Sequence, residues 1–266
     1  MDLKSANSHS LAIVVLAAGR GRRLHPLGLN SPKWLLPVAG RPIGEYQLAG
    51  IQAAAGPDDR LFIVTGYQSD VVATWLTERG APIPAETVHN PQWQELNNWH
   101  SLLVAVERLR AIDWRGGVVV LNSDLCAPPA WYAAFLLAAR HQEAGRAALA
   151  IDFERPLTDE AMKVSGILMG DGRIRCTRIG KRGVEDSIGE YVGMAAFAPA
   201  DWPLLLQALG TFVGLPQHAD EWYEAGFQRL MDSHQLFHAW PTSGSHWVEI
   251  DDPLDWQQAN DVMTTA

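Results

Sequence analysis

The sequence predicts an α/β fold, a Rossmann-like doubly wound mixed sheet with a small antiparallel portion in its second half. Three observations support this fold class. Short, continuous apolar runs rich in β-branched residues recur along the chain, helix-length segments separate the first of these runs, and a tight-turn signal follows residue 150. Apolar runs of this kind are typical of strands that helices cover on both faces of a sheet.

The first half of the chain alternates strands with helices. Strands are expected at Ala12–Leu16, Leu61–Thr65 and Val118–Leu121, and helices at Ile43–Ala55, Gln68–Arg79 and Asn98–Arg110. This order predicts right-handed strand–helix–strand units within one sheet.

The second half of the chain is predicted to form mainly strands. They are expected at Ala147–Asp152, Val164–Met169, Arg173–Ile179, Tyr191–Phe197 and His246–Ile250. An Asp171-Gly172 dipeptide favours a tight hairpin between two of them. Because no repeat or linker interrupts the chain, we expect a single domain over residues 11–266, with a disordered N-terminal extension at residues 1–10.

Composition narrows the class of protein. The chain has 266 residues, of which 47% are hydrophobic, and a formal net charge of -9, which argues against nucleic acid as a partner. Its cysteines, Cys126 and Cys176, have no metal-ligand spacing and are expected to be buried thiols. No apolar run reaches the roughly 18 residues of a membrane span, and Met1–Ser10 lacks a signal-peptide pattern, so a cytoplasmic enzyme is expected. The sequence does not predict the oligomeric state.

A loop that can bind phosphate follows the first strand. Small residues there let backbone N–H groups approach anionic oxygens: Leu16, Ala17, Ala18, Gly19 and Gly21. Arg23 and Lys33 add positive charge for a triphosphate. A dinucleotide-binding loop would need a small residue where Leu24 stands, and a Walker loop would end in Gly-Lys-Ser/Thr. An Arg-rich turn with solvated side chains is the remaining alternative.

Two segments carry a family resemblance: LAAGRGRRL at residues 16–24 and SPKWLLPVAGRPI at residues 31–43. Together they resemble the signature of sugar-phosphate nucleotidyltransferases. Further segments, including those at residues 66–68, 97–102, 122–124, 189–193 and 247–251, are similar to the bacterial phosphocholine cytidylyltransferase-like branch. The resemblance spans about residues 12–260 and implies the nucleotidyltransferase fold. It also implies transfer of a nucleoside monophosphate from an NTP to a small phosphate- or phosphonate-bearing acceptor. Phosphocholine, inositol phosphate and phosphonates are all acceptors within this branch.

Two aspartates end predicted strands, Asp124 and Asp251, and therefore stand at the edge where open α/β sheets bind ligands. Mg²⁺ prefers one or two carboxylates together with substrate phosphates. The resemblance implies that both carboxylates hold Mg²⁺ on the α-phosphate, with Asp252 as the alternative to Asp251. A strand-end aspartate can instead cap a helix.

The resemblance also implies roles for basic residues. Lys33, Arg23 and the metal are assigned to the transferring and leaving phosphates, and Lys181 resembles the lysine that reaches the acceptor phosphate. Lys163 is a rival for that role, and a solvated Lys181 is the alternative. No general base is needed, because a phosphomonoester is largely dianionic near neutral pH.

Amide and hydroxyl side chains are assigned to the nucleotide: Gln68, Asn97, Asn98 and Ser101. Asparagine both donates and accepts hydrogen bonds, as reading a pyrimidine edge requires, although Asn98 could cap a helix instead. CTP is favoured and UTP is not excluded. Aromatic rings and carboxylates that suit a cationic acceptor come from the second half, with Lys163 beside them: Glu190, Tyr191, Trp222, Tyr223 and Glu224. Packing in the core is the alternative for Trp222 and Tyr223.

Other functions compete with a cytidylyltransferase. A UDP- or dTDP-sugar pyrophosphorylase is disfavoured by the Asn-Asn-x-x-Ser segment at residues 97–101. A catalytically silent nucleotide sensor would not need Lys33. A glycosyltransferase would usually carry Asp-x-Asp, whereas Asn122 stands in place of the first aspartate here.

Overall fold

The computed structural model describes residues 8–27, 31–242 and 246–265. Its strands are β1 (Leu11–Ala17), β2 (Pro37–Val38), β3 (Arg41–Pro42), β4 (Arg60–Thr65), β5 (Ala85–His89), β6 (Gly117–Asn122), β7 (Leu125–Cys126), β8 (Arg146–Asp152), β9 (Lys163–Leu168), β10 (Ile174–Gly180), β11 (Ser187–Phe197), β12 (Leu236–Pro241) and β13 (Val248–Glu249). The α-helices are α1 (Ile43–Ala54), α2 (Ser69–Arg79), α3 (Asn98–Ala111), α4 (Pro129–Ala139), α5 (Trp202–Gly210), α6 (Glu224–Asp232) and α7 (Pro253–Thr265). Short 3-10 helices are η1 (Arg22–Leu27), η2 (Lys33–Leu35) and η3 (Pro216–His218).

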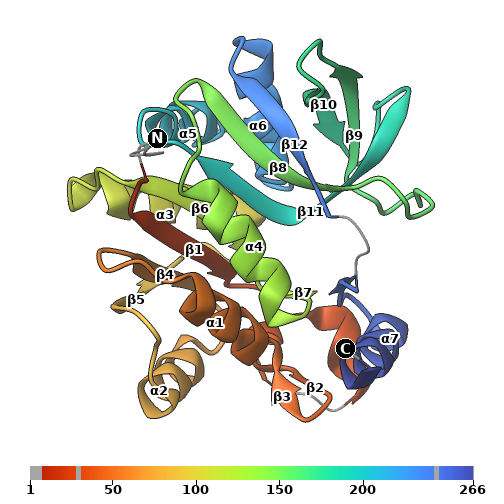
Figure 1. Ribbon diagram of the computed structural model, residues 1–266. Coiled ribbons are helices and arrows are strands. Elements are labelled where there is room, and N and C mark those ends of the chain that lie inside the picture. Colours follow the sequence, from red (N-terminus) through yellow and green to blue (C-terminus); the bar gives the residue numbers. More distant parts are fainter. Residues whose placement is uncertain (1–7, 28–30, 243–245, 266) are drawn as a thin grey trace, which may run out of the picture.

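A nine-stranded mixed sheet organises the chain, in the order β5-β4-β1-β6-β11-β8-β12-β10-β9 (Figure 1). Strands β5, β4, β1 and β6 are parallel, whereas β11 runs antiparallel to both β6 and β8. Strand β10 is antiparallel to β12 and β9. The predicted doubly wound mixed sheet with an antiparallel portion is therefore confirmed.

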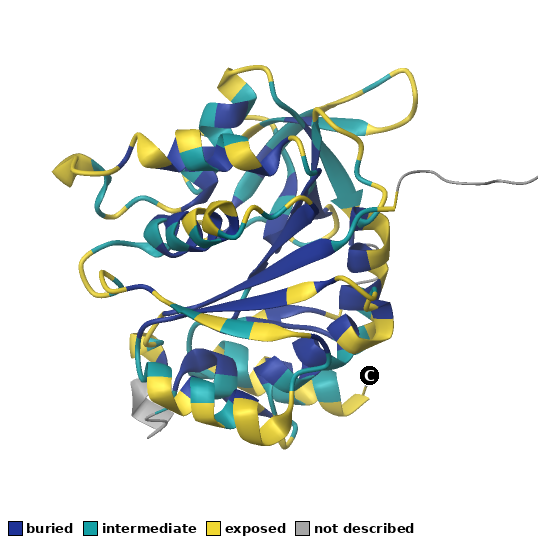
Figure 2. Ribbon diagram, turned by 90° about the vertical axis from the view of Figure 1, so that its left-hand side faces the viewer, coloured by how far each residue is buried: buried dark blue, intermediate teal, exposed yellow. Residues whose placement is uncertain are grey.

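The central parallel strands β1, β4 and β6 bury both faces, as their continuous apolar sequences predict. In β1, Ile13 and Val15 pack in one core together with α1, α2, α4 and α7, while Val14 packs in the opposite core with α3, α5 and α6. Figure 2 shows the resulting layers, with the buried sheet between partly exposed helices. Helices on both faces leave the ends of the strands as the open edge of the sheet.

Five elements of the main fold have no counterpart in the sequence-based prediction: β5, α4, α5, α6 and β12. Strand β5 (AETVH) is an edge strand whose residues alternate between exposed and partly exposed, so it lacks the apolar run of a central strand. Helix α4 (PAWYAAFLLAA) is apolar almost throughout and shows no helical periodicity. Helix α6 lies at residues 224–232, and strand β12 comes after it at residues 236–241.

Two further predictions differ from the structure in extent or place. The strand expected at residues 246–250 is only the two-residue β13, which pairs with β7 outside the main sheet. Of the expected N-terminal extension, residues 1–7 lie outside the described part. The backbone N–H of His9 donates to the carbonyl of Arg140 (2.9 Å).

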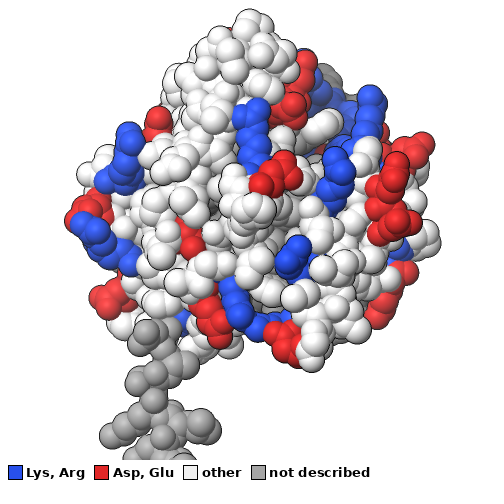
Figure 3. All heavy atoms as spheres, turned by 90° about the horizontal axis from the view of Figure 1, so that it is seen from above, with Lys and Arg blue, Asp and Glu red and all other residues white. Residues whose placement is uncertain are grey.

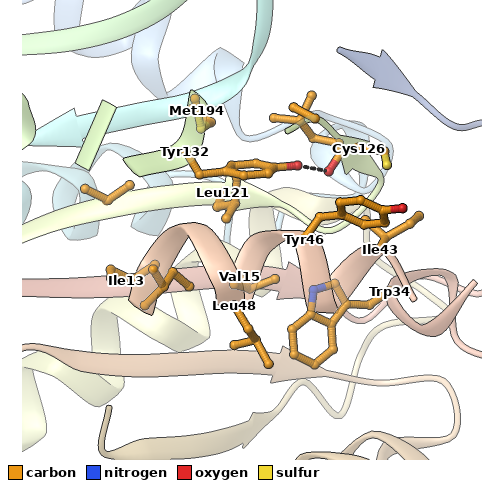
Figure 4. Close-up of a cluster of buried hydrophobic side chains, with 14 of the residues drawn as sticks. Ile13, Val15, Trp34, Ile43, Tyr46, Leu48, Leu121, Cys126, Tyr132 and Met194 are labelled. Carbon is orange, nitrogen blue, oxygen red and sulfur yellow. Dashed lines mark hydrogen bonds between the residues drawn. The ribbon is translucent and has the colours of Figure 1, made fainter. Parts of the chain in front are cut away.

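The core beneath α1 brings large side chains from distant segments together (Figure 4). Trp34, Tyr46 and Tyr132 pack there over Val15 and Leu121. Cys126 and Cys176 are both buried free thiols, as predicted. Within the described residues, no helix combines the length and apolarity that crossing a membrane requires. On the face seen in Figure 3, basic and acidic side chains are interspersed.

Candidate active site

A cavity of about 350 Å³ lies at the carboxyl edge of the parallel strands, where the loops after β1 and β6 meet. Many residues selected from the sequence line it: Leu16, Ala18, Gly19, Gly21, Arg23, Lys33, Asn97, Asn98, Ser101, Asp124, Lys181, Tyr191, Trp222, Glu224 and Asp251. Other predicted site residues do not: Ala17, Gln68, Lys163, Glu190 and Tyr223.

The loop after β1 forms one wall of the cavity. Gly21 has φ +63, a conformation that favours glycine, and this turn leads directly into η1 and Arg23. The carbonyl of Ala18 accepts a hydrogen bond from the Tyr67 N–H (3.0 Å), which ties the loop to the end of β4. Gln68 only supports this contact, since its amide donates to the Tyr67 hydroxyl (3.2 Å).

The Lys33 ammonium lies between the two predicted metal ligands. It donates to Asp124 Oδ2 at 2.9 Å and to Asp251 Oδ1 at 2.6 Å, and Arg23 donates to Asp251 Oδ2 at 2.6 Å. Burial alone would lower the pKa of Lys33, but the two carboxylates outweigh it and raise that pKa above its usual value. Lys33 therefore presents a permanent positive charge at the cavity wall.

Buried side chains fix the position of this group. Trp34, next to Lys33, donates its indole N–H to Gln47 Oε1 (2.8 Å). The Gln47 amide in turn donates to the carbonyls of Asn122 (2.9 Å) and Leu125 (3.0 Å), on both sides of Asp124. Gln47 is fully buried, so Lys33 and the Asp124 turn are held to one another from behind.

Asp251 is held from two directions. The N–H of Ile250 donates to the Asp124 carbonyl (3.1 Å), and the N–H of Asp251 donates to Asp255 Oδ2 (2.9 Å). Asp252, the alternative ligand, instead accepts from the N–H groups of Leu254 and Asp255 at the start of α7. Asp252 therefore acts as a helix cap, outside the cavity lining.

The carboxylates fit a divalent metal in one specific respect. Asp124 Oδ1 is buried and has no hydrogen-bond partner among the described residues, so one ligand position of this carboxylate is unused. The described part of the chain contains no complete metal site, that is, no group of three or more His, Cys, Asp or Glu side chains that could hold a metal ion. Two carboxylates completed by substrate phosphates match the preference of Mg²⁺.

Glu249 also lines the cavity, although it is not among the residues predicted from the sequence. Surrounding protein desolvates its carboxyl group, and Asp124 and Asp251 lie near, so its pKa is raised well above the usual range. The strand period of two would have indicated this residue, because Glu249 and Asp251 fall on the same side of an extended segment.

Asn97 and Asn98, which were predicted to contact the nucleotide, line the cavity and also form hydrogen bonds within the protein. Asn97 is the N-cap of α3, accepting from the N–H of Asn98 (2.7 Å), and its amide donates to the Asp220 carbonyl (2.9 Å). Asn98 Oδ1 accepts from the N–H of Tyr223 (3.0 Å). The Asn98 Nδ2 has no hydrogen-bond partner within the described chain, so it is available to a ligand. Ser101 is held by the amide of buried Asn90 (3.0 Å).

The second half of the chain contributes another wall of the cavity, with Lys181, Trp222 and Glu224. The Lys181 ammonium pairs with Glu160 (3.1 Å) and lies over the Trp222 ring, 5.0 Å from its centre. Glu224 is 4% exposed, its Oε2 has no partner in the described residues, and burial raises the pKa of its carboxyl group to about 7. Lys163 instead donates to the Lys181 carbonyl (3.3 Å), and Tyr223 is fully buried.

A family model agrees with this geometry. The model of the MobA-like NTP transferase domain matches residues 13–225, which include the loop after β1, Lys33 and Asp124. The chain belongs to this family. The recognition of a nucleotidyltransferase from the loop and the Lys33 segment is thereby confirmed.

Two kinds of curated protein are similar in sequence to this chain. The chain is 32% identical to the bifunctional protein GlmU of Anaeromyxobacter dehalogenans over 171 residues, 64% of this chain and 32% of GlmU. It is 29% identical to the 2-aminoethylphosphonate cytidylyltransferase of Lancefieldella rimae over 123 residues, 46% of each protein. It thus spans less than half the length of these relatives.

Known structures share the fold over nearly the whole chain. The CTP:phosphocholine cytidylyltransferase LicC from Streptococcus pneumoniae has a TM-score of 0.73 at 19% identity, covering 96% of this chain and 99% of LicC. The inositol-1-phosphate CTP transferase from T. maritima has a TM-score of 0.71 at 18% identity, covering 96% and 97%. A UDP-glucose pyrophosphorylase reaches 0.74 at 13% identity, covering 96% and 99%.

Proposed function

We propose that this protein transfers CMP from CTP to a small phosphate or phosphonate that carries a cationic group, and releases pyrophosphate. The observation that carries the proposal is the Lys33 ammonium held between Asp124 and Asp251 in a cavity that is also lined by buried Glu224. One wall can take the transferring phosphate, and the other can take a positive group on the acceptor.

The reaction needs alignment and charge compensation more than proton transfer. A dianionic oxygen of the acceptor attacks the α-phosphorus of CTP, a new P–O bond forms, and the bond to the β-phosphate oxygen breaks so that pyrophosphate leaves with the electron pair. Lys33 and Arg23 offset the repulsion between these anions. The backbone of the loop after β1 aims N–H groups at the triphosphate.

Mg²⁺ is the cofactor that the carboxylates suit. Asp124 and Asp251 would hold it, and when bound it would polarise a phosphoryl oxygen and offset negative charge. Family membership supports a divalent metal of this kind, and the unpartnered Asp124 Oδ1 offers it a ligand atom.

Support for CTP comes from the amide of Asn98. Its Oδ1 already accepts from Tyr223, so its Nδ2 faces a ligand only as a donor. A donor matches N3 of cytosine, which is an acceptor, whereas N3 of uracil carries a proton; O2 accepts in both bases and does not distinguish them. The same nucleotide is favoured by the names of the Lancefieldella relative, a cytidylyltransferase, and of LicC, a CTP:phosphocholine cytidylyltransferase.

A cationic acceptor is favoured by Glu224 and Trp222. Glu224 Oε2 is buried without a partner, and an ammonium group would supply the missing charge and hydrogen bond. The ring of Trp222 already lies beneath the Lys181 ammonium, which shows that its face can receive a cation. Lys181 would turn to the anionic end of the acceptor.

A screen of pyrophosphate release tests the proposal. CTP with phosphocholine, phosphoethanolamine or 2-aminoethylphosphonate is expected to give at least about tenfold higher kcat/KM than CTP with glycerol phosphate or glucose-1-phosphate. ATP, GTP and UTP form the nucleotide controls. Equal use of uncharged acceptors would overturn the cationic preference. Preferred use of UTP with a sugar-1-phosphate would favour the second candidate, a sugar pyrophosphorylase, which the GlmU relatives support.

A substitution of Glu224 examines the same preference from the protein's side. Glu224→Gln is expected to raise KM for a cationic acceptor about tenfold and to leave KM for CTP within twofold, because the isosteric amide keeps volume but loses charge. Glu221→Gln, a partly exposed glutamate outside the main cavity lining, is the matched control.

The pH dependence offers a further readout of the same variant. A carboxyl group with a pKa of about 7 is charged above that pH and neutral below it. The advantage of a cationic over an uncharged acceptor should therefore shrink as pH falls below 7 in the native enzyme. Glu224→Gln should show no such change. A native-like pH profile in that variant would show that Glu224 does not take part in acceptor recognition.

A further inference from the structure

A chain of three side chains crosses from the acceptor wall to the metal-binding turn. The Tyr191 and Tyr223 hydroxyls are 3.1 Å apart, and the Tyr223 hydroxyl donates to Asn122 Oδ1 at 2.9 Å. Asn122 ends β6, two residues before Asp124, and lines the cavity. Neither tyrosine hydroxyl is exposed to bulk solvent, since Tyr191 is 2% and Tyr223 0% exposed.

The donor order of this chain follows from its proton count. A phenol has one proton, and Tyr223 gives its proton to Asn122 Oδ1, so its oxygen must accept the proton of Tyr191. Burial raises the pKa of both phenols well above the usual value, which keeps both protonated. The Asn122 amide is thereby held with its oxygen toward Tyr223 and its Nδ2 turned away.

The Nδ2 of Asn122 has no hydrogen-bond partner in the described part of the chain. It packs instead over Gly193, which has φ +81. A Cβ at Gly193 would lie 2.7 Å from this Nδ2 and 2.9 Å from the Asn122 Cβ, so only glycine leaves room for the amide. Asn122 thus brings a fixed, unpartnered donor to the same cavity lining as Asp124 and Tyr191.

We propose that Asn122 binds the acceptor, its Nδ2 donating to an anionic oxygen of the phosphate or phosphonate group, and that Tyr223 and Tyr191 are positioning residues that set the direction of this amide. The proposal rests on the proposed function and deepens it. Asn122 recognises the anionic end of the acceptor, whereas Glu224 recognises its cationic end. The separation of these two groups then selects acceptors in which a short linker joins the two charges.

Steady-state kinetics with CTP and 2-aminoethylphosphonate test this inference. Asn122→Ala should raise KM for 2-aminoethylphosphonate about tenfold or more and leave KM for CTP within twofold, because a hydrogen bond to a charged group is lost. Asn122→Asp should raise KM for 2-aminoethylphosphonate further, since a carboxylate repels the anionic group of the acceptor. An effect of Asn122→Asp no greater than that of Asn122→Ala would show that the oxygen, not the nitrogen, faces the acceptor, and would overturn the proposal.

The positioning role requires a double-mutant cycle. Tyr223→Phe removes only the hydroxyl and should raise KM for the acceptor severalfold, but should add nothing in the Asn122→Ala background, because the amide it orients is gone. Tyr46→Phe is the control, since it removes a buried hydroxyl bonded to the Val38 carbonyl (3.0 Å) away from the cavity. Additive effects of Tyr223→Phe and Asn122→Ala would refute the positioning role.

The native enzyme separates failure of this inference from failure of the proposed function. If native protein releases no pyrophosphate from CTP with 2-aminoethylphosphonate or phosphocholine, the proposed function fails. If native protein is active and Asn122→Ala keeps the native KM for the acceptor, the inference alone fails. Calorimetric titration of 2-aminoethylphosphonate into native and Asn122→Ala protein gives a readout independent of turnover and should show the same weakening.

Discussion

Asparagine in place of Asp124 or Asp251 is expected to lower kcat at least about a hundredfold, a loss of about 2.7 kcal/mol of transition-state stabilisation. Each substitution removes one carboxylate charge from the pair that holds Lys33 and that, in the proposed function, would bind Mg²⁺. The amide keeps the volume and one oxygen of the native side chain, so the fold should remain. Pyrophosphate release at saturating CTP and acceptor measures kcat, and circular dichroism checks the fold.

Asp252→Asn provides the matched control, because Asp252 is adjacent in sequence but caps α7 rather than lining the cavity. Its kcat should stay within about twofold of native, since asparagine also serves as a cap. Native-like rates in both Asp124→Asn and Asp251→Asn, measured with Mg²⁺ present, would refute a carboxylate-bound metal in this site.

Replacing Lys33 by alanine is expected to lower kcat about a hundredfold or more while KM for CTP changes by less than about fivefold. The Lys33 ammonium is fixed by two carboxylates and by the hydrogen-bonded Trp34 next to it, so in the proposed reaction it would be pre-aligned where charge develops. Removing it loses that stabilisation and also leaves Asp124 and Asp251 facing each other without a cation between them.

Arg79→Ala controls for the loss of a cation, because Arg79 forms an exposed ion pair with Glu45 away from the cavity. Its kcat should equal the native value. If Lys33→Ala changes only the apparent affinity for CTP, Lys33 anchors the ground-state triphosphate and has no special role in the transition state.

Much of the site was predictable because its determinants are local in sequence. The small residues after β1, Lys33 behind Pro32, and the strand-end Asp124 all express their role within a few residues. The ends of parallel strands meet at one edge of the sheet, so these local patterns also predict proximity. The cavity indeed brings Lys33, Asp124 and Asp251 together.

Other roles depend on partners far away in the chain. The Asn97 amide donates to Asp220, 123 residues later, and Tyr223 bonds to Asn122, 101 residues earlier. No periodicity or motif encodes such pairs. Trp222 and Tyr223 are neighbours in sequence, yet the first lines the cavity and the second is buried behind it, because the chain turns into α6 at this point.

The most direct test of the account is to identify the product that native protein makes from CTP, Mg²⁺ and 2-aminoethylphosphonate or phosphocholine, by phosphorus NMR and mass spectrometry. The expected product is a compound in which CMP is joined through its phosphorus to the acceptor's phosphate or phosphonate, with one pyrophosphate released for each acceptor consumed. Pyrophosphate release without incorporation of either acceptor, or no reaction of CTP with either, would contradict it.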